Sequence, residues 1–266
     1  MKTKKLQAVI FSGVLLLLIK AEPSRTQDKV HSADLKVEEL VQKVCRRLAS
    51  YPDFEKWQAE VVSSYIYTDK NWLPEKIRRV KKRLLVDGDT REEEILEAVE
   101  IEKGKTRDIT EVYRQQRLER LKKLKEEAEK ARKKGQQPAT KNQLTKDDLI
   151  PFSEKRKNLY QFFLLGEELY QGVKVFVIEA RAKEKNENLF EGLYYINQAT
   201  FDPLKMVLQP SRFPKFIREF QVEVELEPWE GLLMLKKSRL RVYGGFLFKS
   251  VRMMIEEDYA SFRPVG

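Results

Sequence analysis

The half of the chain after Asn158 is built from short segments in which apolar and polar residues alternate, each ended by turn-forming residues. In the clearest segment, 215–227, Phe220, Val222 and Val224 share one face and the polar residues between them share the other. A period of two places successive side chains on opposite faces of a strand. Such a succession of strands predicts a large antiparallel sheet, which must curl to cover its apolar face.

Residues that favour turns set the expected limits of these strands. We expect strands over 159–165, 173–183, 189–197, 204–209, 215–227, 238–243 and 246–257. We expect turns at 166–167, 184–188, 199–203, 210–214, 228–231 and 244–245.

The first half of the chain begins with an amphipathic pattern. Apolar residues recur at helical spacing from Val37 to Leu48, and Tyr51-Pro52 follows, so we expect a helix over 34–50. Alternation over 57–68 predicts a long, half-buried strand, and 78–86 predicts a second that is closed by a turn at 87–89. Residues 95–101 continue as a third strand, although 91–98 is also compatible with a helix.

A polar, basic segment occupies 105–150. Residues 105–146 contain fourteen Lys/Arg and six Asp/Glu, so the net charge of +10 is local to this segment and the N-terminus. Helix-forming residues with only a thin apolar stripe predict a long charged helix over 108–134. We interpret 105–150 as an insertion between strands. No zinc-finger spacing or RNA-binding signature accompanies the charge, so nucleic acid is not an expected partner.

The N-terminus has the order of a secretory signal. Three lysines precede an uncharged apolar run, 6–19, and Ala21 supplies a small residue for cleavage. The run is shorter than the roughly 20 apolar residues that span a bilayer. We therefore expect 1–21 to be a signal peptide and the mature protein to reside in the periplasm or cell envelope. The alternative is an uncleaved anchor.

The chain offers little material for catalysis. Cys45 is the only cysteine and falls on an apolar helix face, so we expect a buried thiol and no intramolecular disulfide. His31 is the only histidine and precedes the first helix, which argues against histidine-based triads and metal sites. The acidic runs 92–94 and 256–258 are interpreted as solvated edges or turns. We expect no enzymatic activity, no cofactor and no metal.

Two stretches resemble the LolA-like superfamily of periplasmic outer-membrane lipoprotein-sorting proteins. They are the strand 57–69, entered through Trp57, and the hairpin 192–205, Gly-Leu-Tyr-Tyr-Ile-Asn-Gln-Ala-Thr-Phe-Asp-Pro-Leu-Lys. The resemblance covers 34–262 and is weakest over 90–155. It implies an α+β fold over 30–266, in which a large curled antiparallel sheet forms an open half-barrel. An N-terminal helix and, in this chain, the inserted charged helix accompany the sheet.

The resemblance also implies a function. Members of the superfamily hold acyl chains in the apolar cavity of the half-barrel, so the expected partners are lipid acyl chains or lipidated proteins. The chain would then be an exported carrier of the outer-membrane lipoprotein-sorting type. The alternative is a regulatory or interaction module of the envelope that has the same fold and no transported ligand.

Two sets of residues are candidates for contact with a bound acyl chain or with an external partner. The cavity would be lined by apolar side chains of the strands: Trp57, Val61, Phe162, Phe176, Tyr194, Met206, Phe220 and Val222. The same side chains would equally fill a core beneath the helix. On the charged helix, contact with an anionic membrane surface or an acidic partner is expected from Arg114, Arg117, Lys122 and Lys125. The alternative there is a solvated helix without a partner.

Overall fold

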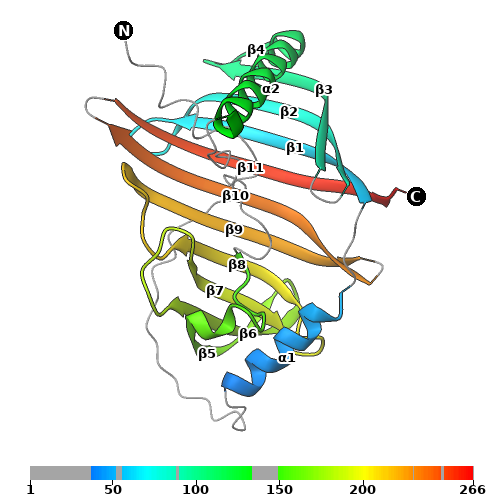
Figure 1. The fold of residues 1–266 in the computed structure, drawn as a ribbon, viewed down its shortest axis with the longest axis vertical. Coiled ribbons are helices and arrows are strands. Elements are labelled where there is room, and N and C mark those ends of the chain that lie inside the picture. Colours follow the sequence, from blue (N-terminus) through cyan, green and yellow to red (C-terminus); the bar gives the residue numbers. More distant parts are fainter. Residues whose placement is uncertain are drawn as a thin grey trace.

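The alternating segments form one antiparallel sheet in the computed structural model (Figure 1). The structure describes residues 37–51, 56–87, 90–133, 149–229, 231–246 and 249–265. Within these ranges lie eleven strands, two α-helices and one short 3-10 helix, η1 (Lys157–Leu159). The strands are β1 (Lys56–Thr68), β2 (Pro74–Asp87), β3 (Thr90–Glu102), β4 (Lys105–Asp108), β5 (Tyr160–Tyr170), β6 (Val173–Ala182), β7 (Phe190–Asn197), β8 (Pro203–Pro210), β9 (Ile217–Trp229), β10 (Leu232–Phe246) and β11 (Lys249–Pro264).

The order of strands in the sheet is β4-β3-β2-β1-β11-β10-β9-β8-β7-β6-β5. Every neighbour in this order is also a neighbour along the chain, except for β1 and β11. Their antiparallel pairing joins the first strand to the last and so unites the two halves of the sheet. The strands β4 and β5 lie at opposite edges and the sheet is not closed. The fold class expected from the sequence, a large curled and open antiparallel sheet with helices, is therefore present.

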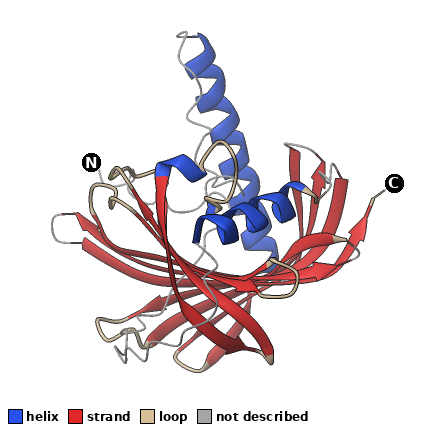
Figure 2. Cartoon of the chain, turned by 90° about the horizontal axis from the view of Figure 1, so that it is seen from below, coloured by secondary structure: helices blue, strands red, loops and turns tan. Residues whose placement is uncertain are grey.

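Helix α1 (Val37–Ala49) has the amphipathic face that its sequence predicts. Leu40, Val44 and Leu48 are among its buried residues, and acidic residues in its first turn and basic residues in its last complement the helix dipole. Figure 2 shows the sheet bent into a trough with both helices on its concave side. Burial of the apolar face of α1 against the trough is what holds this helix in place.

Helix α2 (Thr110–Lys133) connects the β4 edge to the segment that leads into β5. The Asp108 carboxylate accepts a hydrogen bond from the backbone N–H of Thr110 at 2.7 Å, which caps the start of the helix. Leu118, Leu121 and Leu124 are exposed, and the far end of α2 extends beyond the sheet (Figure 2). No helix within the described residues is both long enough and apolar enough to cross a bilayer.

Two turns expected from glycine are wrong. At Gly166, β5 continues to Tyr170 because a register shift between Leu164 and Gly166 absorbs the glycine, and the chain reverses at 171–172 instead. Gly244 lies inside β10, where it pairs with Val251. A Cβ at Gly244 would lie 2.9 Å from the Phe216 carbonyl oxygen, so this glycine serves a close backbone approach rather than a turn.

The remaining differences concern strand limits. The region 91–98, which was compatible with helix or strand, lies within β3 and pairs with β2. The sequence did not indicate β4. It made β10 too short at both ends, and it started β11 three residues too early, at 246, and ended it too early, at 257.

Candidate ligand-binding site

The concave face of the sheet is defined by residues that pair across neighbouring strands. Directly paired residues lie on the same face, so the register traces one row from β5 to β3. The row runs through Leu164, Ile178, Tyr194, Met206, Val224, Ser238, Glu257, Ser63, Val80 and Ala98. It is apolar at both ends and polar in the middle, which divides the concave face into distinct regions.

The apolar region over β5–β9 brings together six of the eight side chains expected to line a cavity. They share one cluster, in which four are buried and two are partly buried: Phe176, Tyr194, Met206, Val222, Phe162 and Phe220. Trp57 and Val61 lie in a second cluster, together with Ala59, Leu84 and Tyr259, at the first half of β1. The structure thus separates Trp57 and Val61 from the other six.

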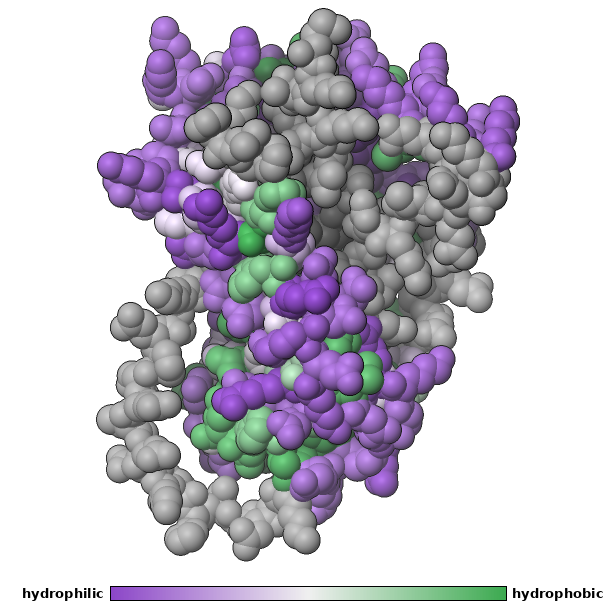
Figure 3. Space-filling view, turned by 60° about the vertical axis from the view of Figure 1, so that its left-hand side comes forward, coloured by the Kyte–Doolittle hydropathy of each residue, from purple (hydrophilic) through white to green (hydrophobic). Residues whose placement is uncertain are grey.

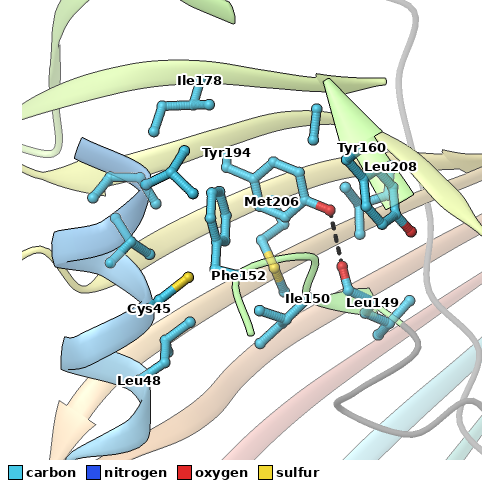
Figure 4. Packing of buried hydrophobic residues seen from close by; sticks show 14 of the residues in the cluster. Cys45, Leu48, Leu149, Ile150, Phe152, Tyr160, Ile178, Tyr194, Met206 and Leu208 are labelled. Carbon is cyan, nitrogen blue, oxygen red and sulfur yellow. Dashed lines mark hydrogen bonds between the residues drawn. The ribbon is translucent and has the colours of Figure 1, made fainter. Parts of the chain in front are cut away.

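Side chains of the protein's own 149–152 segment and of α1 fill much of the apolar region over β5–β9 (Figure 4). The Phe152 ring meets the Tyr194 ring edge-on at a centroid distance of 5.0 Å and stacks on Phe162 at 5.3 Å. The Tyr194 hydroxyl donates a hydrogen bond to the Leu149 carbonyl at 2.9 Å, and burial raises the pKa of Tyr194 well above its usual value. Sequence reasoning missed the 149–152 segment. Its signal was a short apolar run, Leu-Ile-Pro-Phe, directly after the polar connector.

Helix α1 covers the same region and is fixed to the sheet by a charged network. The Arg47 guanidinium lies 2.6 Å from an Asp202 carboxylate oxygen, and the Tyr51 hydroxyl donates to the same oxygen at 2.7 Å. Asp202 is buried in the turn between β7 and β8. Cys45, on the inner face of α1, is also buried, and burial raises the pKa of its thiol. The thiol is therefore part of the core, as its helical position predicted.

An open cleft of about 490 Å³ lies between α1 and the start of β5. Its apolar lining is Val37, Val41, Tyr160, Phe162 and Phe163, and its polar lining is Glu38, Gln42, Lys157, Asn158, Gln161 and Lys183. Phe162 is the one residue of the expected cavity that lines it. Other clefts of similar volume lie at the turn between β3 and β4 and on the outer face of β6–β9, and charged side chains line them as well. Of these three clefts, the one at α1 takes apolar side chains from both a helix and a strand.

The polar middle of the concave face is a buried ionic cluster. The Glu257 carboxylate accepts hydrogen bonds from Ser63 at 2.7 Å, from Lys82 at 3.2 Å and from Tyr259 at 2.8 Å. Burial opposes the charged forms, but their mutual attraction keeps the pKa of Glu257 lowered and that of Lys82 raised. The acidic runs at 92–94 and 256–258 lie within β3 and β11 and not in turns. Glu92, Glu94 and Asp258 are exposed, as expected of solvated strands, whereas Glu93 and Glu257 both meet Lys82.

The basic residues expected to form a surface contact divide along α2. The Arg114 guanidinium donates to the Ile95 carbonyl at 2.8 Å, and Arg117 pairs with Glu93 at 2.7 Å, so both bind the protein's own sheet. Lys122 is exposed farther along the helix. Lys125 follows in the same helix, and its side chain lies outside the described part of the structure. His31 also lies outside the described residues, within which no cluster of His, Cys, Asp or Glu is suited to hold a metal.

No family model matches the chain, and no curated protein matches it in sequence. Among solved structures, a DUF1329 family protein from Desulfovibrio piger matches at 11% identity over 86% of this chain and 92% of its own, with a TM-score of 0.39. An outer membrane lipoprotein-sorting protein domain from Vibrio parahaemolyticus matches at 11% identity over 86% and 93%, also with a TM-score of 0.39.

A LolA superfamily protein from Nitrosomonas europaea matches at 11% identity over 88% of this chain and 95% of its own, with a TM-score of 0.34. The chain is similar to LolA-superfamily structures. The superfamily that the sequence resembles is thus named among these matches.

Proposed function

We propose that this protein binds, non-covalently, the acyl chain of a lipid or of a lipid-modified protein. The observation that carries the proposal is the cleft between α1 and β5, which is lined by apolar side chains from both elements and by polar ones that include Lys157 and Lys183. Its volume of about 490 Å³ is within the usual range of small-molecule sites. Each methylene buried there would contribute roughly 0.8 kcal/mol.

The two lysines suit the polar end of such a ligand. The Lys157 ammonium pairs with Glu154 at 2.7 Å, and that of Lys183 donates to the Asn158 carbonyl at 2.8 Å. Each ammonium has three donors, so both retain donors toward the cleft. An anionic or carbonyl head group would lie at this border, with the acyl chain directed along Phe162 toward the core.

Uptake of a fluorescent acyl probe by the purified full chain tests this proposal, together with native mass spectrometry and lipid extraction. Gln42→Trp places a large side chain in the cleft from the partly exposed side of α1, so it should weaken probe binding at least about tenfold while leaving the melting temperature unchanged. Gln116→Trp on the exposed face of α2 is the matched control and should bind like the parent. Absence of lipid and of probe uptake, or full binding by Gln42→Trp, would contradict the proposal.

A second candidate function is an interaction module without a transported ligand. It is favoured by the packing of Phe152 against Tyr194 and Phe162, because side chains expected to line a cavity instead support a filled core. In this case a partner protein would bind the outside of the sheet. The probe experiment separates the two functions, since the module takes up no acyl chain while remaining folded by circular dichroism.

The proposed place of action is the cell envelope, reached through residues 1–21 as a signal peptide. The order of lysines, apolar run and small residue supports this. Intact-mass measurement of the protein recovered from the envelope fraction should show a chain that begins after Ala21. A full-length chain that stays in the cytoplasm would contradict export.

A further inference from the structure

The two edges of the open sheet differ in a way that bears on assembly. At one edge, β4 is a strand of only four residues, all exposed and three of them charged. A short, charged edge discourages pairing with another strand. At the other edge, β5 has eleven residues, and no strand of the described part of the chain pairs with its outer side. Within the described residues, one edge is thus protected, and the other is unpaired on its outer side, with a register shift at Gly166.

The open edge is also apolar. On β5, Leu165 is 56% exposed and Phe163 is 38% exposed, while Leu159, just before the strand, is 44% exposed. Figure 3, which turns the left side of Figure 1 forward, shows hydrophobic surface among hydrophilic residues in its lower half, where the β5–β8 half of the sheet lies. A long edge with exposed apolar side chains is a template for strand pairing.

We infer that β5 pairs with β5 of a second copy of this chain, in antiparallel orientation, to form a two-fold symmetric dimer. The two sheets would then continue into one another across the shared edge. The proposal does not depend on acyl-chain binding, since it rests on the edge strand and its flanking charges.

The charges around β5 are ordered so that two copies of the strand complement one another when they run antiparallel. The approach to the strand is basic, Lys155-Arg156-Lys157, its middle is apolar, and Glu167-Glu168 lie toward its end. The basic residues lie in a turn and in η1, just before the strand, so in an antiparallel pair the basic approach of each copy lies near the acidic end of the other. An unrelated extended peptide would need this order by chance, whereas a second copy has it necessarily. The charge order therefore favours self-association.

A specific register follows from the exposed side chains. A two-fold axis at Phe162 pairs Tyr160 with Leu164, and it brings the exposed Leu159, at the end of η1, near the exposed Leu165, at the register shift of β5. It keeps inward-facing residues opposite inward-facing residues, so the concave faces of both copies lie on the same side. Since the cleft at α1 borders this strand, the two clefts would lie next to one another across the axis.

Sedimentation equilibrium of the full chain, up to roughly 100 μM because single-strand interfaces are small, measures the dimer directly. Leu165→Lys should raise the dissociation constant at least about tenfold by placing a charge in the interface. Leu118→Lys on α2 is the matched control, because Leu118 is 66% exposed and lies away from β5. A monomeric parent, a dimer unaffected by Leu165→Lys, or a dimer lost with Leu118→Lys would overturn the proposal.

Charge exchange gives a second test that a local loss of structure would not mimic. Glu167→Lys with Glu168→Lys makes both ends of the edge basic, and Arg156→Glu with Lys157→Glu, the residues opposite them in this register, makes both ends acidic. Each double variant should be monomeric alone, and an equimolar mixture should form a heterodimer in low salt. Homodimers of either variant, or a mixture that stays monomeric while the parent dimerises, would contradict the proposed orientation.

Discussion

At the scale of single residues, Asp202 makes a buried polar contact that adds to the apolar packing of α1 on the sheet. Burial alone would raise the pKa of its carboxyl, but hydrogen bonds from Arg47 and Tyr51 hold that pKa below its ordinary value. The stabilisation is therefore complete above the ordinary carboxyl pKa, roughly 4, and is lost as the pH falls through the lower folded-state value. Asp202→Asn should reduce the free energy of unfolding at pH 7 by about 2 kcal/mol.

Urea unfolding at pH 7 and near pH 3 checks this prediction. The parent should lose part of the Asp202 contribution at the acidic pH, so the difference between parent and Asp202→Asn should shrink there. Asp258→Asn is the control, because Asp258 is exposed and pairs with Lys237 at the surface, and it should cost less than about 0.5 kcal/mol. An equal effect of the two substitutions would show that burial of Asp202 is not the cause.

The buried pair Lys82 and Glu257 gives a different kind of prediction. Lys82→Met removes the cation and leaves the Glu257 carboxylate buried with only neutral donors, which should cost about 3 kcal/mol. Adding Glu257→Gln removes that charge and keeps an acceptor for Ser63. The double variant should therefore be more stable than Lys82→Met alone. Chemical unfolding of both variants measures the difference, and additive losses would mean that the two charges are not coupled.

Residue-scale predictions from the sequence succeeded where a periodic pattern fixed the face of an element. Cys45 and the inner residues of β7–β9 are buried, as helical spacing and alternation indicate. The partners of these residues were not predictable, because Phe152 reaches Tyr194 from a segment without periodicity. The burial of Glu257 was missed for a related reason. Its counter-charge comes from Lys82 on another strand, which a local pattern does not reveal.

At the scale of elements, α2 consists of an anchored first part and an exposed second part. Tyr113 packs with β3 residues, and Arg114 and Arg117 bind the sheet, whereas the leucines from Leu118 onward are exposed. Replacing residues 118–133 by a Gly/Ser linker should therefore change the melting temperature by less than about 4 °C, equivalent to roughly 1 kcal/mol. Arg114→Ala should destabilise the protein more than this replacement does. Differential scanning calorimetry of the two variants tests the order.

The second part of α2 also carries the proposed contact with anionic membranes. Each exposed basic residue near such a surface contributes about 1 kcal/mol, screened by salt. Lys122→Glu with Lys123→Glu should weaken cosedimentation with anionic vesicles in low salt, and vesicles of neutral lipid should bind neither protein. Unchanged binding to anionic vesicles would identify α2 as a solvated helix.

Element limits were harder to predict than element types. Glycine at 166 and 244 indicated turns because it favours them, but in this fold one glycine lies at a register shift and the other at a close approach to Phe216. Both uses depend on neighbouring strands and leave no local signal. The helix expected over 108–134 agrees closely with α2, since its composition favours helix along its whole length.

At the scale of the whole molecule, the pairing of β1 with β11 makes one sheet of two runs of hairpins. The alternating pattern predicted the curl of the sheet, because a long meander with one apolar face must bend over it. The openness of the sheet was implied only by the resemblance to the LolA-like superfamily. The sequence did not predict that the first strand, β1, and the last strand, β11, pair in the middle of the sheet. That arrangement depends on long-range pairing, which leaves β4 and β5 as the free edges.

Hydrogen exchange over a range of protein concentrations tests this arrangement together with the proposed dimer. Amides of β1 and β11 lie in the middle of the sheet and should exchange slowly at every concentration, because they open only with the whole sheet. Amides on the outer side of β5 should exchange fast when the protein is dilute and more slowly as a second copy pairs with them. Those of β4 should not change. In Leu165→Lys, the concentration dependence at β5 should disappear, whereas protection at β5 that is constant across concentrations in the parent would exclude the strand-paired dimer.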